Sequence, residues 1–292
     1  MDRVKKNRES KFTPDRNKKQ NPKSYALIPM SDATLSTQAM QVINNYLHLP
    51  FSKKKISCPY FNNKRSRVRG ALGVLIGKGT PEEIVNEATL IALREKVDLK
   101  NLDNEQTKKF LVEHNLGVDC SGLVYHVLNA ELNARKLGPL RKHIKRPWIR
   151  SPIRKLIALF RPAENTGVNT FYNDINSKEI RLSEIQPGDF IIIMNTGANY
   201  NLHHILLVHK VANTSSPYQG EGLPAGRGEV VLRYTHSFQF PDDGLYNHGV
   251  RQEEIKIIDS NKNLLEQNWN EPRTREYAKT AREIKIKRLK VL

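Results

Sequence analysis

One cysteine stands where the surrounding residues favour covalent chemistry. The segment 117–128 joins a turn, a thiol and apolar residues at helical spacing. Gly117 can end the preceding segment at positive φ, and Asp119 can cap a helix that begins at Cys120. Free backbone N–H groups in a first helical turn favour a thiolate, so we expect the pKa of this thiol to lie below its free value of about 8.5. A thiolate there could attack a carbonyl carbon.

A nucleophile of this kind needs a base, and the sequence offers histidines downstream. The segments 190–194, 203–211 and 229–238 have the pattern of strands. Side chains alternate along a strand, so His203 and His204 point to opposite faces and only one of them can face Cys120. The alternative is that Cys120 is a small buried apolar residue, the commonest role of a lone cysteine. Its polar and small neighbours favour the chemical interpretation.

Three motifs, in this order, resemble the NlpC/P60 family of papain-like cysteine peptidases. They are Asp-Cys-Ser-Gly-Leu-Val at 119–124, Pro-Gly-Asp before the strand at 190, and His-Ile at 204–205. The resemblance implies an α+β fold in which the nucleophile helix packs on a central antiparallel sheet, with extra helical insertions. It also implies that Cys120 is the nucleophile, that His204 is the base, and that His236 orients the base. His209, Asn213 and His248 are alternatives for the orienting residue.

The resemblance also gives expectations about substrate. Tyr60, in a Pro-Tyr pair, and Asp119 and Ser121 match positions that line the substrate side, where they would read a free amine and a carboxylate. Family members mostly cleave peptide stems of bacterial cell walls, so the implied substrate is a peptide or peptidoglycan, with no metal or organic cofactor. Two other functions stay open. One is a binding module for anionic polymers or nucleic acid on an inactive scaffold, and the other is a thiol acyltransferase.

The chain divides into a tail and one domain. Residues 1–24 are rich in Lys, Arg, Asn and Pro, which predicts a disordered basic tail. Residues 25–292 are expected to form the catalytic domain, with insertions at about 64–116, 132–180 and 212–228. Helices are predicted after Ser31 or Asp32, from Thr80 to about residue 97, and over 104–114. We expect the last two helices to roof or narrow the cleft.

The chain is strongly basic, with 48 Lys and Arg against 30 Asp and Glu and a formal net charge of +18. Segment 135–161 holds many cations and no acidic residue, interleaved with large apolar residues, which predicts an amphipathic helix with a basic face. Such a face fits an anionic polymer or a membrane surface, whereas nucleic acid is possible but not favoured.

The remaining features narrow the classes of site and of location. Cys58 and Cys120 have no paired spacing, so no zinc motif or disulfide framework is indicated. No apolar signal region or run long enough to cross a bilayer is visible. This makes the cytoplasm the default expectation, although relatives in the resembled family are often exported.

Overall fold

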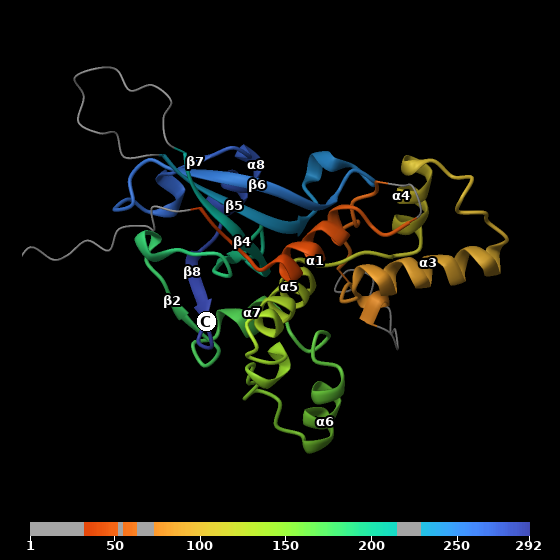
Figure 1. Cartoon of the computed structure of the whole chain (residues 1–292), viewed down its shortest axis with the longest axis horizontal. Coiled ribbons are helices and arrows are strands. Elements are labelled where there is room, and N and C mark those ends of the chain that lie inside the picture. The colour runs from red at the N-terminus through yellow and green to blue at the C-terminus, as the bar shows by residue number, and fades with distance from the viewer. Residues whose placement is uncertain (1–31, 52–54, 63–72, 215–228) are drawn as a thin grey trace, which may run out of the picture.

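A single antiparallel sheet with helices on it forms the centre of the protein (Figure 1). The computed structural model describes residues 32–51, 55–62, 73–214 and 229–292. The strand order is β2-β8-β3-β4-β5-β6-β7, and β1 pairs with β4. The strands are β1 (Ala33–Thr34), β2 (Ser177–Glu179), β3 (Phe190–Thr196), β4 (Leu202–Thr214), β5 (Glu229–Phe238), β6 (Gly249–Ile257), β7 (Asn268–Trp269) and β8 (Glu283–Leu289). The expected α+β class is therefore confirmed.

Seven α-helices lie within the described ranges. They are α1 (Thr37–Leu47), α3 (Pro81–Glu95), α4 (Asn104–Glu113), α5 (Cys120–Ala134), α6 (Pro152–Phe160), α7 (Val168–Tyr172) and α8 (Pro272–Lys279). Helices α1 and α5 pack on one face of the sheet, in a core that includes Ile205 and Leu207 of β4. Leu206 and Val208 face a second core that includes Ala278 of α8. The sheet thus has a buried layer on each face.

Local capping signals place the start of α3 correctly. The side chain of Thr80 accepts from Glu83 N, and the Glu83 carboxylate accepts from Thr80 N, which satisfies two free N–H groups at the helix start. Pro81 occupies the first helical position, where its missing N–H is not needed. The predicted helix over 104–114 is also confirmed, as α4. Both helices lie at the right of Figure 1, beside the sheet.

Two local predictions were wrong. The first helix begins at Thr37, capped by Ser36, and not after Ser31 or Asp32. The reason is tertiary, because Ala33 and its neighbour pair with β4 as a short strand. The residue with positive φ before α5 is Asn115, and not Gly117.

Gly117 is required for a different reason, since a Cβ at this position would lie 2.4 Å from the carbonyl oxygen of Pro59. The glycine therefore permits the close approach of two backbone segments just before α5.

The predicted tail at 1–24 lies outside the described residues, as does most of the predicted insertion at 212–228. The insertion at 64–116 is described from residue 73 onward and contains α3 and α4. The insertion at 132–180 contains α6 and α7. In the described part of the chain, no helix is long and apolar enough to span a membrane. Nor do three His, Cys, Asp or Glu side chains gather there in a way that could hold a metal ion.

Candidate active site

Cys120 is the first residue of α5, as the sequence predicted. The carboxylate of Asp119 accepts a hydrogen bond of 2.6 Å from the backbone N–H of Gly122, which caps the helix. The apolar positions predicted to face inward are buried, namely Leu123, Val124, Val127 and Leu128. Cys120 itself is only 6% exposed. The sequence at 119–128 therefore fixes both the start of this helix and its buried face.

The segment that leads into α5 contacts both β4 and β5 where these strands part. Their ladder begins at the pair Leu207 and Thr235, so the strand ends nearest the site are not paired in it. Ser237 of β5 donates to the carbonyl oxygen of Val118 at 2.7 Å. On the other side, the backbone N–H of Ile205 in β4 is close enough to the sulfur of Cys120 to favour its thiolate. The thiol therefore lies beside the peptide that joins His204 to Ile205.

The thiol is not the preformed thiolate that the helix start suggested. Burial raises the pKa of Cys120 to about 12, and the negative charge of Asp119 acts in the same direction. The ammonium of Lys78 and the N–H groups of Ile205 and Ser121 oppose this rise without overcoming it. The prediction of a pKa below the free value was wrong, because desolvation of the charged form outweighs the effect of the first helical turn.

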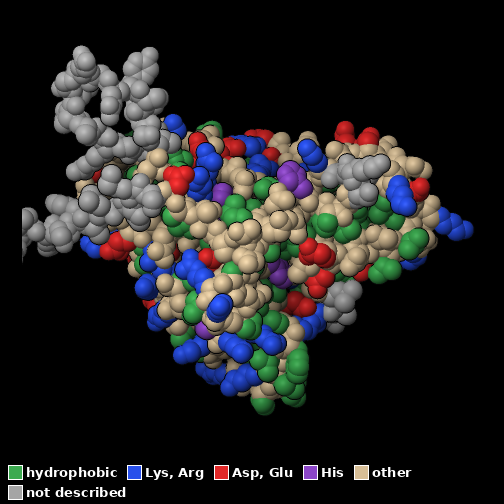
Figure 2. All heavy atoms as spheres, viewed as in Figure 1, with side chains coloured by type: hydrophobic (Ala, Val, Ile, Leu, Met, Phe, Trp, Pro, Cys, Tyr) green, Lys and Arg blue, Asp and Glu red, His purple; other side chains and the backbone are tan. Residues whose placement is uncertain are grey.

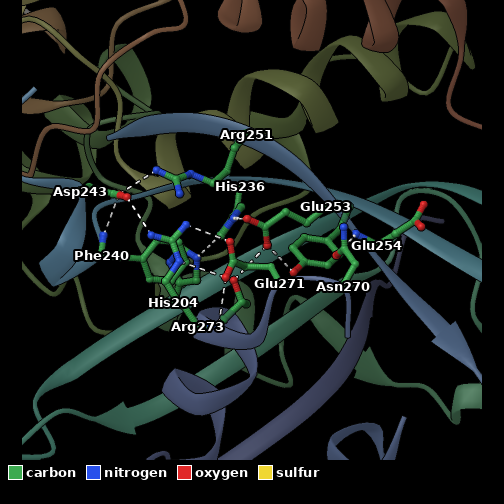
Figure 3. Close-up of polar contacts among 12 residues, drawn as sticks. His204, His236, Phe240, Asp243, Arg251, Glu253, Glu254, Asn270, Glu271 and Arg273 are labelled. Carbon is green, nitrogen blue, oxygen red and sulfur yellow. Dashed lines mark hydrogen bonds and ion pairs between the residues drawn. The ribbon is translucent and has the colours of Figure 1, made fainter. Parts of the chain in front are cut away.

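A buried line of polar side chains begins at His204 and runs through β5 to β6 (Figure 3). His204 Nε2 and His236 Nδ1 are 2.8 Å apart. His236 Nε2 lies 3.5 Å from Glu253 Oε1. Both imidazoles are buried, and His236 has no exposed area at all. The structure thus brings together the two histidines that the resemblance paired, and it adds a carboxylate behind them.

One arrangement of protons along this line leaves His204 able to act as a base, although His236 Nε2, 3.5 Å from the Glu253 carboxylate, has no hydrogen-bond partner within the described residues. If Glu253 accepts from His236 Nε2, then His236 Nδ1 carries no proton and accepts from His204 Nε2. His204 Nδ1 is then left without a proton, and this is the atom a general base uses. Burial lowers the pKa of His204 well below its usual value, and the charge of His236 adds to the effect. His204 is therefore neutral at pH 7 and able to accept a proton.

Glu253 was not found by sequence reasoning. Burial alone would raise the pKa of its carboxyl, but the hydrogen bonds that it accepts outweigh burial, and its pKa is lowered. Tyr234 Oη donates to Glu253 Oε2 at 2.6 Å and Thr274 Oγ1 donates to the same oxygen at 2.9 Å. Tyr234 and Glu253 are direct cross-strand partners in β5 and β6. A carboxylate in the strand after His236 was the available signal, but the register between the strands was needed to read it.

The thiol and the His204 imidazole are not joined by a hydrogen bond within the described residues. Along β4, Ile205 packs in the core that includes Cys120, whereas Leu206 packs in the core on the opposite face. Alternation therefore places His204 with Leu206, and it places His203 on the side of α5. His203 Nδ1 accepts from a backbone N–H at 3.1 Å. The expectation that His204 is the histidine on the side of Cys120 therefore does not hold in this packing, and a reaction that uses His204 needs its ring to move toward the thiol.

Asp119 and Ser121 are engaged by a lysine from elsewhere in the chain. Lys78 is 7% exposed, and its ammonium donates to Asp119 Oδ1 at 2.8 Å, to Ser121 Oγ at 2.6 Å and to the carbonyl oxygen of Thr166 at 3.0 Å. The Asp119 carboxylate therefore already binds the Lys78 ammonium at the position where the resemblance implies a substrate amine. The role of both residues toward substrate stays a prediction, and Lys78 is a site residue that sequence reasoning missed.

Tyr60 lies next to the segment that precedes α5, since it forms a bridge with Val118. Its backbone N–H donates to His248 Nδ1 at 3.0 Å, and its hydroxyl accepts from Asn62 at 3.0 Å. These three residues line a small pocket together with Val112 of α4, as part of a larger set of neighbours. The inserted helix α4 thus forms one wall of a pocket beside Tyr60, and Cys120 and His204 do not line this pocket.

The other candidates for the orienting residue make different contacts. His209 Nδ1 is 2.9 Å from Thr235 Oγ1, on the face of the sheet that α5 covers. Asn213 lies near the end of β4, and its backbone N–H donates to the Asp32 carboxylate at 3.2 Å. Among the described residues, only His236 is hydrogen bonded to the ring of His204.

The pH dependence of alkylation tests the state of the thiol. Because the pKa of Cys120 is raised to about 12, the fraction of thiolate at pH 7 is small. As long as the pH is below the pKa, this fraction grows about tenfold for each unit by which the pH rises. We expect the rate of reaction with iodoacetamide to rise continuously from pH 7 to 10 in a chain carrying Cys58→Ala. A plateau reached below pH 8 would show a preformed thiolate and contradict the assignment.

Substitution of Glu253 by glutamine tests the carboxylate behind the histidines. The change keeps the shape of the side chain and removes the charge that stabilises a protonated imidazole, so kcat/KM should fall roughly 10- to 100-fold. The acid limb of the pH profile should move to lower pH, because protonation of the histidine pair becomes harder. Glu254→Gln, one residue on and facing Arg233, should change neither value. An unchanged acid limb in the Glu253 variant would limit this residue to a structural role.

No known protein family, no curated protein and no solved structure matches this chain.

Proposed function

We propose that this protein is a cysteine-dependent hydrolase of amide bonds with a papain-like NlpC/P60 fold. The observation that carries the proposal is the line from His204 through His236 to Glu253, which begins at the peptide beside the Cys120 thiol. A carboxylate behind two imidazoles provides a neutral base, and the proposal requires that the His204 ring come within reach of the Cys120 sulfur, to which it is not hydrogen bonded here. The packing of α5 on an antiparallel sheet supports the fold part of the proposal.

In the proposed reaction the neutral pair acts by general-base catalysis. As the sulfur of Cys120 bonds to the substrate carbonyl carbon, its proton passes to His204 Nδ1. The charge that develops on the imidazole is stabilised through His236 by Glu253. The C–N bond then breaks, the proton of His204 goes to the leaving amine, and water cleaves the thioester to free the acid. Backbone N–H groups at the start of α5, including that of Cys120, can stabilise the oxyanion.

The proposed substrate is a peptide, with the stem peptides of peptidoglycan as the first class to examine. This follows from the resemblance of the motifs at 119–124, 187–189 and 204–205 to those of the family. The Lys78 ammonium on Asp119 bears on specificity, since it removes the need for a substrate amine at that carboxylate. We therefore propose that substrates without a free amino group near the cleaved bond are accepted.

The test is the release of amines from peptidoglycan and from blocked peptides by the parent chain, Cys120→Ala and Cys58→Ala. Cys58 is a matched control, since it is also buried, and its sulfur contacts the carbonyl oxygen of Pro59. We expect Cys120→Ala to release no amine above background and Cys58→Ala to stay active. Equal activity of the parent and the Cys120 variant would overturn the proposal. Transfer of an acyl chain to another acceptor, without a free acid product, would assign the thiol to an acyltransferase instead.

A further inference from the structure

Helix α6 carries its apolar stripe on the outside. Ile153, Leu156, Ile157 and Phe160 recur at helical spacing along one side, and all are exposed, Ile153 by 70% and Phe160 by 73%. Only Ala158 is buried in this helix. Helices on the surface of globular proteins turn such a stripe toward the core. In α6 the arrangement is reversed, so the stripe has no partner within the described protein.

This helix lies at the tip of a projection away from the sheet (Figure 1). Figure 2 shows hydrophobic side chains gathered there together with Lys and Arg. Trp148 precedes the helix and is also exposed. The Ser151 hydroxyl accepts from Arg154 N, and Pro152 fills the first position, so the helix is capped and formed before any contact. A preformed surface loses little conformational freedom on binding.

Cations surround the stripe. Arg150 precedes α6, and Arg154 and Lys155 lie in its first two turns, while segment 135–161 contains no acidic residue. Within the described ranges, Arg154 and Lys155 form no ion pair. Aliphatic side chains next to unpaired cations are typical of helices that lie in the interface of an anionic bilayer, with the apolar side in the acyl region and the cations at the phosphates.

We propose that α6 docks this protein on the surface of an anionic phospholipid bilayer. With nine residues the helix lies in the interface and does not cross it. A second copy of the chain fits the surface poorly, because two copies would bring the same cations together. Nucleic acid would contact the cations but leave the aliphatic side chains in water. This inference does not depend on the proposed hydrolase.

The test is the binding of the full chain to sucrose-loaded vesicles, pelleted at 0.1 M salt, of phosphatidylcholine alone or with one quarter phosphatidylserine. We expect binding to the anionic vesicles and a blue shift of the Trp148 emission. Ile153→Ser with Phe160→Ser should lower the partition coefficient about tenfold or more. In a separate variant, Arg154→Gln with Lys155→Gln should lower the partition coefficient, relative to the parent chain, by a factor of about five for each cation removed.

The matched control is Leu90→Ser with Leu93→Ser, which removes two exposed leucines from α3. This variant should bind within about twofold of the parent, since α3 lies elsewhere. The proposal is overturned if the Ile153 and Phe160 variant binds as the parent does, or if neutral vesicles bind equally well. It is also overturned if no vesicle binds and the same variant instead abolishes self-association in sedimentation velocity.

Discussion

Replacing His204 by alanine should lower kcat/KM for amide cleavage by about 10²- to 10⁴-fold, the usual contribution of a general base. The thiol of Cys120 is protonated at neutral pH because burial raises its pKa to about 12. Attack on a carbonyl therefore requires that the proton leave during the reaction. His204 is neutral at this pH and is held through Nε2 by His236, which leaves Nδ1 as the acceptor. Without the ring, only water can accept the proton.

The matched control is His203→Ala, one residue earlier on the same strand. His203 belongs to the face of β4 that α5 covers, and its Nδ1 accepts from the backbone N–H of Asn195. It has no place in the line that ends at Glu253. We expect its replacement to change kcat/KM by less than about tenfold. If the His203 variant loses more activity than the His204 variant, the base has been assigned to the wrong face of the strand.

The decline of kcat/KM at acid pH gives a second check on the assignment of His204 as the base. Because the pKa of His204 is lowered well below 6.5, the base stays unprotonated, and active, as pH falls from 7 through 6.5. Activity should decline only at lower pH, where the ring gains a proton. A decline centred at or above pH 6.5 would indicate an exposed histidine as the base.

Features set by neighbours in sequence were predictable. The caps at Thr80 and Asp119 depend on residues within three positions, and both helices begin where the sequence indicated. The short strand β1 was not predictable, because Ala33 pairs with Val211 and nothing near Ala33 signals that partner. Because Ala33 and Thr34 pair with β4, they are not part of the first helix, although the local sequence predicted that the helix would include them.

The chemistry of the site followed the same division. Local reasoning found the thiol at a helix start but gave the wrong direction for its pKa, because burial is decided by the whole fold. Glu253 meets His236 only through the register of β5 and β6, which the sequence does not state. Lys78 reaches Asp119 across 41 positions, and its cation stands in a basic, glycine-rich stretch without any sign of a buried partner. The local sequence therefore located the thiol at the start of α5, whereas its surroundings depend on tertiary contacts.

Replacing Lys78 by methionine should destabilise the fold by about 3–5 kcal/mol, the usual cost of removing one partner of a buried ion pair. The Lys78 ammonium is the cation that contacts the Asp119 carboxylate, and its side chain is 8% exposed. Methionine fills a similar volume but cannot donate to Asp119, Ser121 or the carbonyl oxygen of Thr166. The loss should appear as a lower midpoint in urea unfolding. Lys109→Met is the control, because its pair with Glu113 is long and exposed, and such pairs contribute about 0–1 kcal/mol.

The double variant Lys78→Met with Asp119→Asn separates the charge from the packing. If the cost comes from an unpaired buried carboxylate, neutralising Asp119 should restore part of the stability, and the two changes should not add. The amide of asparagine can still accept from Gly122 N, so the cap of α5 is kept. The thiol provides a second readout, since the Lys78 charge lowers the pKa of Cys120 and its loss should slow alkylation at any fixed pH. A single variant that loses less than about 1 kcal/mol, with unchanged alkylation, would show that Lys78 does not control the charge at the start of α5.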